Sequence, residues 1–107
     1  MGLGWLQNQV ALDARIFVMK RKASGPLLVI NPEVEQAGRM TEVALEGCLS
    51  NPGMRYPVER PKKCIISYLD EHQQRKSLQL TGIDSRCALH EIDHLNGINI
   101  GDKRVEQ

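Results

Sequence analysis

Short apolar runs alternate with polar residues through most of the chain, and the polar breaks carry residues typical of turns. The runs over residues 15–20 and 27–30 are rich in β-branched and aliphatic side chains, so they predict two strands joined by a turn. The Asn-Pro pair at residues 31–32 is expected to end the second strand. A third short strand is predicted over residues 42–45, before a loop that the turn sequence Asn-Pro-Gly at residues 51–53 closes.

The alternation continues in the second half of the chain until one segment changes to a helical period. Strands are predicted over residues 55–60 and 63–69, on either side of Pro61. Residues 76–80 are expected to pair with the second of these strands across a polar turn. An antiparallel meander is the simplest arrangement of the strands. Residues 82–95 form the one convincing helix of the sequence, so the predicted fold class is α+β.

The predicted helix has a packing face and a neighbouring polar face. Asp84 or Ser85 is available to cap its N-terminus, and Gly97 is positioned to end it. At about 100° per residue, one arc is apolar and is expected to pack; it consists of Ala88, Ile92 and Leu95. The adjoining arc carries groups capable of chemistry, namely Cys87, His90, Glu91 and His94. Leu89 and Asp93 point elsewhere, so we do not expect them to touch a metal directly.

Composition narrows the class of protein. The chain has 107 residues, of which 41% are hydrophobic and 25% charged, which fits one small globular domain. The net charge is only +1 with both signs interspersed, so neither direct nucleic-acid binding nor a membrane partner is expected. Three widely spaced cysteines, without a signal peptide or a membrane-length apolar run, indicate a reduced, cytoplasmic protein. Of these cysteines, Cys64 is expected to be a buried core residue.

The sequence His-Glu-Ile-Asp-His at residues 90–94 is the strongest chemical signal in the chain. Positions i and i+4 lie one above the other on a helix, so His90 and His94 can bind one cation while Glu91 reaches a water on it. A pattern with three fixed positions also arises by chance on ordinary helix surfaces. Cys48 offers a third ligand, and three protein ligands with one open position are typical of a catalytic site. The motif therefore indicates metal-assisted hydrolysis.

Three segments together resemble the peptide deformylase family: residues 2–9 (GLGWLQNQ), 46–50 (EGCLS) and 90–94 (HEIDH). Their order and separation match the family, and the intervals between them are also similar to it. The resemblance implies antiparallel β-sheets packed around one central metal-binding α-helix, in a single domain over residues 1–107. It also implies that the domain lacks the usual N-terminal helical segment and the C-terminal extension of the family.

The resemblance implies removal of the N-formyl group from the initiator methionine of nascent polypeptides, with release of formate. Cys48, His90 and His94 would bind one divalent metal ion, and Glu91 would act first as general base and then as general acid. The family favours Fe2+, and Zn2+ or Ni2+ could replace it, because ligand spacing does not select among these metals. The implied partners are N-formylmethionyl nascent peptides, with the ribosome exit region as a further candidate contact.

The resemblance also implies roles for residues around the metal. The side chain of Gln9 and the backbone N–H of Leu49 correspond to the pair that stabilises the oxyanion during amide hydrolysis. Four residues would contact the peptide or line a methionine pocket: Leu3, Gly4, Gly47 and Cys87. Plain structural roles remain open for some of these residues, since Gln9 could be a surface amide and Cys87 a core residue.

A supporting group is expected behind the metal ligands. Glu46 would accept the remaining N–H of a ligand histidine and so fix the tautomer and orientation of its ring. The alternative is that Glu46 is a solvated carboxylate. Arg60 and Asp93 are a further candidate, for a supporting ion pair.

Two departures from the family pattern keep a second hypothesis open. Residues 5–7 read Trp-Leu-Gln where the family usually has Leu-Ala-Ala, and Leu89 stands where it usually has glutamine. Larger side chains in the first motif could shift Gln9 or narrow the cleft, and Leu89 removes a polar partner behind the metal. The alternative is therefore a catalytically silent, metal-binding homologue that captures formylated N-termini or a partner. A zincin-like endopeptidase is disfavoured, because residues 96–107 offer no third ligand at a recognised spacing.

Overall fold

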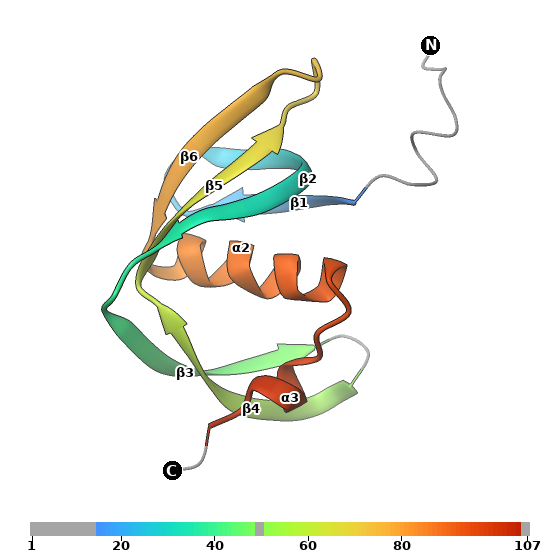
Figure 1. The fold of residues 1–107 in the computed structure, drawn as a ribbon. Coiled ribbons are helices and arrows are strands. Elements are labelled where there is room, and N and C mark those ends of the chain that lie inside the picture. Colours follow the sequence, from blue (N-terminus) through green and yellow to red (C-terminus); the bar gives the residue numbers. More distant parts are fainter. Residues whose placement is uncertain (1–14, 49–50, 106–107) are drawn as a thin grey trace.

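The computed structural model describes residues 15–48 and 51–105. Figure 1 shows one long helix, α2, enclosed between a curved sheet and a smaller pair of strands. No helix within the described residues is long and apolar enough to cross a membrane. In chain order the elements are β1 (Ile16–Arg21), β2 (Gly25–Ala37), β3 (Thr41–Cys48), β4 (Asn51–Pro61), β5 (Lys63–Leu69), β6 (Arg75–Thr81), α2 (Gly82–Leu95) and α3 (Ile100–Lys103).

The larger sheet is antiparallel and has the strand order β1-β2-β5-β6. The predicted pairing across the polar turn is confirmed, because β5 and β6 run in unbroken register from Lys63 opposite Thr81 to Leu69 opposite Arg75. The turn itself is held by Asp70, whose side chain accepts the backbone N–H groups of residues 72 and 74 at 2.8 and 2.9 Å. Such an aspartate turn is a common way to reverse a chain between strands.

The predicted end of the second strand at residues 31–32 is wrong, because β2 continues to Ala37. Its pairing with β5 shifts register between Ile30 and Glu33, and Asn31 takes a positive φ of 49°. A bulge of this kind accommodates Pro32, which has no N–H to donate, without ending the strand. Pro32 is fully buried there.

The strands do not form one meander. β3 and β4, which come between β2 and β5 in the sequence, pair with each other in a separate two-stranded sheet. The chain enters and leaves this small sheet at one crossing point, where the N–H of Gly38 donates to the carbonyl of Lys63 at 2.9 Å. A Cβ on Gly38 would lie 3.0 Å from the Lys63 side chain and 3.1 Å from its carbonyl oxygen. The close approach of the two segments therefore requires glycine.

Helix α2 has the predicted bounds, but its N-terminal cap was predicted wrongly. Thr81 is the N-cap residue and makes no side-chain capping bond. Asp84 lies in the first turn and accepts the backbone N–H of Lys22 at 3.0 Å, while Ser85 is fully buried. The predicted end is confirmed: Gly97 has a positive φ of 76° and its N–H donates to the carbonyl of His94 at 3.0 Å.

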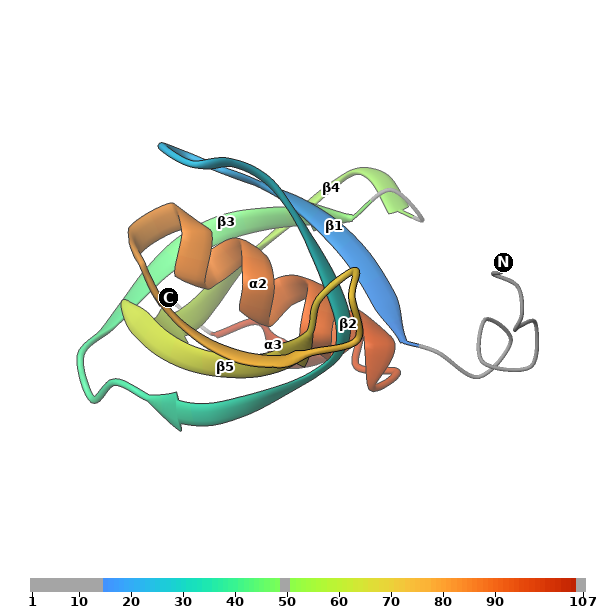
Figure 2. The same ribbon diagram turned by 90° about the horizontal axis from the view of Figure 1, so that it is seen from above.

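The apolar core lies between α2 and the inner face of the larger sheet, which curves over the helix (Figures 1 and 2). Cys64 is 2% exposed, as expected for a core residue. Leu89 is also buried and belongs to this core, although periodicity places it outside the packing arc. The core consists of Phe17, Met19, Val29, Cys64, Ile66, Tyr68, Leu80, Ala88, Leu89 and Ile92. The α+β class is confirmed.

Candidate metal centre

Three residues of α2 form a group capable of holding a metal ion. Ligand atoms of His90, Glu91 and His94 all lie within 4.8 Å of one another. The two imidazole rings lie one helical turn apart with centroids separated by 4.4 Å, and Glu91 Oε1 lies 3.9 Å from His94 Nδ1. The His90 side chain is 14% exposed, whereas those of His94 and Glu91 are 33% and 39% exposed. The group therefore runs from the protein interior toward solvent.

Glu46, on β3, lies behind His90 and is 6% exposed. Its Oε1 is 2.8 Å from His90 Nδ1 and accepts Arg60 Nη2 at 2.9 Å. Its Oε2 accepts Arg60 Nε at 2.7 Å and Arg86 Nη1 at 2.5 Å. Each carboxylate oxygen thus has two polar partners, which satisfies a buried carboxylate fully.

The protonation state of Glu46 decides which nitrogen of His90 is available. Burial disfavours the charged carboxylate, but hydrogen bonds from His90, Arg60 and Arg86 and the charge of Arg60 outweigh burial and lower the pKa of Glu46 to about 2. An ionised carboxylate only accepts hydrogen bonds, so the proton of a neutral His90 ring lies on Nδ1. The lone pair on Nε2 is then free to bind a metal, which is the usual arrangement behind a ligand histidine.

The predicted ion pair between Arg60 and Asp93 is confirmed. Arg60 Nη1 lies 2.8 Å from Asp93 Oδ2, and both residues are buried, at 3% and 8% exposure. Lys103 Nζ lies 3.3 Å from the same carboxylate oxygen. Burial would lower the pKa of Arg60, but hydrogen bonds and the charges of Glu46 and Asp93 raise it, so the guanidinium stays charged. A buried ion pair therefore connects β4 to α2 on this side of the helix.

The third expected ligand, Cys48, is the last residue of β3, and its backbone pairs with Asn51 of β4. Its side chain lies outside the described part of the structure, so its contact with the histidines stays a prediction. Gly47 is exposed and lies opposite Arg55 in the β3–β4 register. Four other expected site residues lie outside the described residues: Leu3, Gly4, Gln9 and Leu49.

Cys87 lies one helical turn before Glu91, is half-buried and packs against the edge of the apolar core. Burial, together with the negative charges of Glu91, Asp84 and Glu46, raises the pKa of the Cys87 thiol. The thiol is therefore protonated near neutral pH and presents a small, neutral surface. Cys87 and the exposed Ile83 line a cavity of about 850 Å³ between the start of α2 and residues 20–23.

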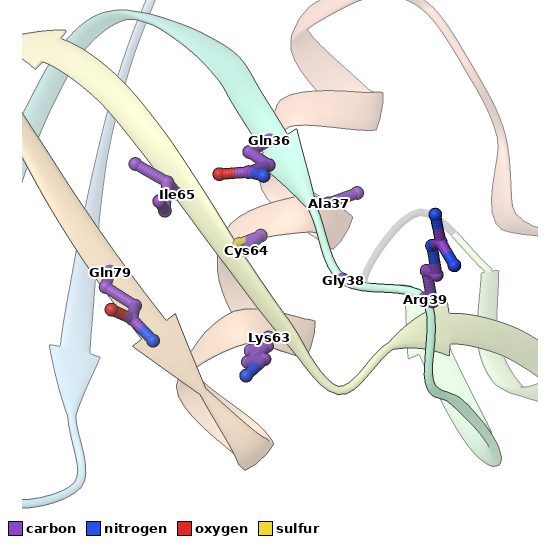
Figure 3. Close-up of a pocket in the computed structure, with 8 residues that line it drawn as sticks. All are labelled: Gln36, Ala37, Gly38, Arg39, Lys63, Cys64, Ile65 and Gln79. Carbon is purple, nitrogen blue, oxygen red and sulfur yellow. The ribbon is translucent and has the colours of Figure 1, made fainter.

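A second cavity, of about 320 Å³, is lined by residues of β2, β5 and β6 and by Gly38 and Arg39 (Figure 3). It opens where β2 ends beside β5, and its lining contains neither histidine of the motif. Lys63 and Arg39 extend in different directions from it, so their charges do not converge on a common ligand. This cavity therefore has no role in the candidate metal centre.

The sequence pattern did not single out Arg86, which the structure places in this site. Arg86 precedes His90 by one helical turn, and its guanidinium contacts Glu46 and two backbone carbonyls of the small sheet. The only sequence signal was its spacing of four residues from His90, which places both side chains on one face of the helix.

Comparison with known proteins decides the family. The family model described as polypeptide deformylase matches residues 2–107. The chain belongs to this deformylase family. The family predicted from the three sequence motifs is therefore confirmed.

Known deformylases are similar over nearly the whole chain. It is 39% identical to the peptide deformylase of Picosynechococcus sp. over 109 residues, covering 98% of this chain and 58% of the relative. The peptide deformylase of Thermotoga neapolitana is 40% identical and is covered to 62%. This chain therefore spans little more than half the length of the curated deformylases that it matches.

Solved deformylase structures share the fold. The crystal structure of the Thermotoga maritima peptide deformylase superposes with a TM-score of 0.80 at 40% identity, covering 86% of this chain and 62% of that one. The Synechococcus elongatus enzyme in complex with actinonin gives a TM-score of 0.79 at 38% identity, covering 87% and 50%. At this level of identity, the common fold and the family assignment support each other.

Proposed function

We propose that this protein is a metal-dependent hydrolase that removes the N-formyl group from the methionine at the start of nascent polypeptides. One observation carries the proposal: in a chain of the deformylase family, the ligand atoms of His90, Glu91 and His94 lie together, and Glu46 Oε1 engages His90 Nδ1 at 2.8 Å, which leaves Nε2 for a metal. The reaction adds water to the formyl amide and yields formate and a free α-amino group.

The donor set fits one divalent metal ion. Two imidazoles from α2 and the thiolate of Cys48 at the end of β3 would be its protein ligands, leaving a position for water. We favour Fe2+ because the family resemblance implies it. Zn2+ or Ni2+ could take its place, because imidazole and thiolate ligands suit all three metals. The metal would supply a nucleophile at neutral pH by lowering the pKa of a bound water.

Glu91 is placed for proton transfer. Its carboxylate is part-exposed beside His94, so it can reach a water at the open position without being held by the buried charge network. In the proposed reaction Glu91 accepts the proton of the attacking water and delivers it to the departing amine. The Gln9 side chain and the Leu49 backbone N–H would stabilise the negative oxygen that develops on the formyl carbon.

The peptide would bind in an extended form beside β3. Gly47 is exposed on that strand and lacks a side chain that would keep a peptide away, and Leu3 and Gly4 would contact the other side of the peptide. The half-buried Cys87 would line the pocket for the methionine side chain. We include the ribosome exit region as a further partner, because formylated N-termini emerge there.

Formate release from a formyl-methionyl tripeptide tests the proposal. The unaltered chain, loaded with Fe2+ or Zn2+, is expected to release formate, and Glu91→Gln is expected to lower kcat by about 10²–10⁴-fold while metal binding persists. Glu71→Gln, which alters an exposed glutamate of the β5–β6 turn, serves as the matched control. Full activity in Glu91→Gln would remove the proposed base. Binding of the peptide without turnover by the unaltered chain would instead favour the silent homologue.

A further inference from the structure

Arg86 joins three elements of the fold through one side chain. Its Nη1 donates to Glu46 Oε2 on β3 at 2.5 Å and to the carbonyl of Val58 on β4 at 3.0 Å. Its Nη2 donates to the carbonyl of Glu42, also on β3, at 2.5 Å. The Arg86 side chain is 16% exposed: its contacts with Glu46 and Val58 are part-buried, whereas the contact with the Glu42 carbonyl is exposed to solvent.

The metal-binding group needs such a connection because its parts come from separate layers. His90 and His94 lie on α2, whereas Glu46 and Cys48 lie on β3, in a small sheet that shares no ladder with the larger one. A metal site tolerates ligand distances only within about 0.2 Å, so the strand must be held in register against the helix. Apolar packing alone does not fix this register, since the buried side chains in the described part of the small sheet are the charged Glu46 and Arg60 together with Val58.

Arg86 lies close in sequence to one set of ligands and contacts the strand that carries the other. It lies one helical turn before His90, and its acceptor Glu46 lies two residues before Cys48. The planar guanidinium offers five N–H donors in a rigid fork, so it can reach both strands at once. A lysine ammonium is a single point charge on a flexible stem and cannot reproduce this set of directions.

We propose that Arg86 is a positioning residue of the metal centre, which fixes the end of β3 that carries Cys48 against the helix face that carries the two histidines. This inference rests on the proposed metal-dependent function but concerns assembly of the site rather than the reaction. Its effect is therefore measured on metal binding and on the geometry around the metal.

Co2+ titration of the whole chain tests the inference, because the visible bands of Co2+ report coordination geometry and a thiolate-to-cobalt absorption reports a sulfur ligand. Arg86→Met is expected to weaken Co2+ binding by about tenfold or more and to reduce the thiolate band. Arg86→Lys keeps the charge but is expected to show much of the same loss. Arg39→Met, at an exposed arginine between β2 and β3, removes the same charge and is expected to bind like the unaltered chain.

The outcomes separate positioning from charge and from stability. Wild-type affinity and wild-type bands in a folded Arg86→Met would overturn the inference, and so would their complete recovery in Arg86→Lys, since charge alone would then suffice. If Arg86→Met fails to fold, Arg86→Lys decides the question by its cobalt spectrum. Strong Co2+ binding by the unaltered chain without formate release would count against the proposed function and leave the role of Arg86 intact.

Discussion

The two faces of α2 meet the rest of the molecule in opposite ways. Toward the larger sheet, the helix presents Ala88, Leu89 and Ile92 to an apolar core. Toward the small sheet it presents Arg86 and Asp93, which form ion pairs with the buried Glu46 and Arg60 of that sheet. One helix therefore takes part in an apolar interface with the larger sheet and in an ionic interface with the small sheet.

The two interfaces contribute differently to stability. Each fully buried aliphatic side chain of the core stabilises the fold by about 1.5–3 kcal/mol. This gain depends on the buried area and little on how the side chains are oriented toward one another. Buried ion pairs lose most of their attraction to the cost of removing charges from water, so their net contribution is small. Removing one partner is nevertheless costly, because an unpaired charge is left behind. The charged face thus fixes where groups lie, whereas the apolar face supplies the favourable free energy.

Breaking the ionic interface at its centre should have the largest effect. Arg60→Met removes the guanidinium that binds both Glu46 and Asp93, and leaves two buried carboxylates with fewer partners. We expect the free energy of unfolding of the metal-free chain to fall by about 3–5 kcal/mol in urea denaturation. Arg104→Met, at an exposed arginine whose guanidinium lies over the Tyr56 ring, should cost less than about 1 kcal/mol. A small effect at Arg60 would mean that water already reaches these carboxylates.

Ile66→Ala tests the apolar interface, because it leaves a cavity in the core between α2 and the larger sheet. Ile66 is fully buried at the centre of the larger sheet, so we expect a loss of about 2–5 kcal/mol in the free energy of unfolding. Because Ile66 belongs to the apolar core and takes part in none of the ion pairs described around Glu46, metal affinity of the folded variant should stay within about twofold, which titration with Co2+ measures. A tenfold loss of metal affinity in this variant would show that the two interfaces are coupled.

The fold was predictable where the signal is local. The period of residues 82–95 fixes the helix, and the turn at Asp70 fixes the β5–β6 hairpin. The sheet order was not predictable, because β2 and β5 pair across the whole β3–β4 hairpin and no local pattern specifies that contact. The bulge at Pro32 was missed because proline signals the end of a strand unless the pairing shifts around it.

The same division holds for the candidate site. His90, Glu91 and His94 belong to one helical segment, so their spacing alone predicts that they meet. Arg86 was missed because arginine on a helix is usually a solvated residue. Its carbonyl acceptors are 28 and 44 residues away, so only the assembled fold brings them within reach.

Acid should weaken the ionic interface by a smaller amount. The pKa of Glu46 is about 2 in the folded chain and near its ordinary value of 4.5 when unfolded. The unfolded chain therefore binds the proton first, and the stability from this group is present above about pH 4.5 and lost as the pH falls toward about 2. That difference corresponds to about 3 kcal/mol in full.

Unfolding of the metal-free chain measured across this pH range checks the expectation. The variant Glu46→Gln should lack this part of the pH dependence. Asp70, whose pKa is also lowered, chiefly by the Gln74 backbone N–H, contributes to the pH dependence in both proteins and cancels in the comparison. Identical pH profiles for the two proteins would mean that Glu46 is not ionised against its arginine partners.

The smallest effect is expected at the rim of the ionic interface, where Lys103 Nζ lies 3.3 Å from Asp93 Oδ2 and the lysine side chain is 41% exposed. Water screens this pair and the lysine loses rotamer freedom in it, so Lys103→Ala should cost no more than about 1 kcal/mol of unfolding free energy. The difference from wild type should shrink further in about 1 M salt. Arg60 and Lys103 bind the same carboxylate oxygen, so a loss at Lys103 as large as that at Arg60 would contradict the claim that burial sets the size of these effects.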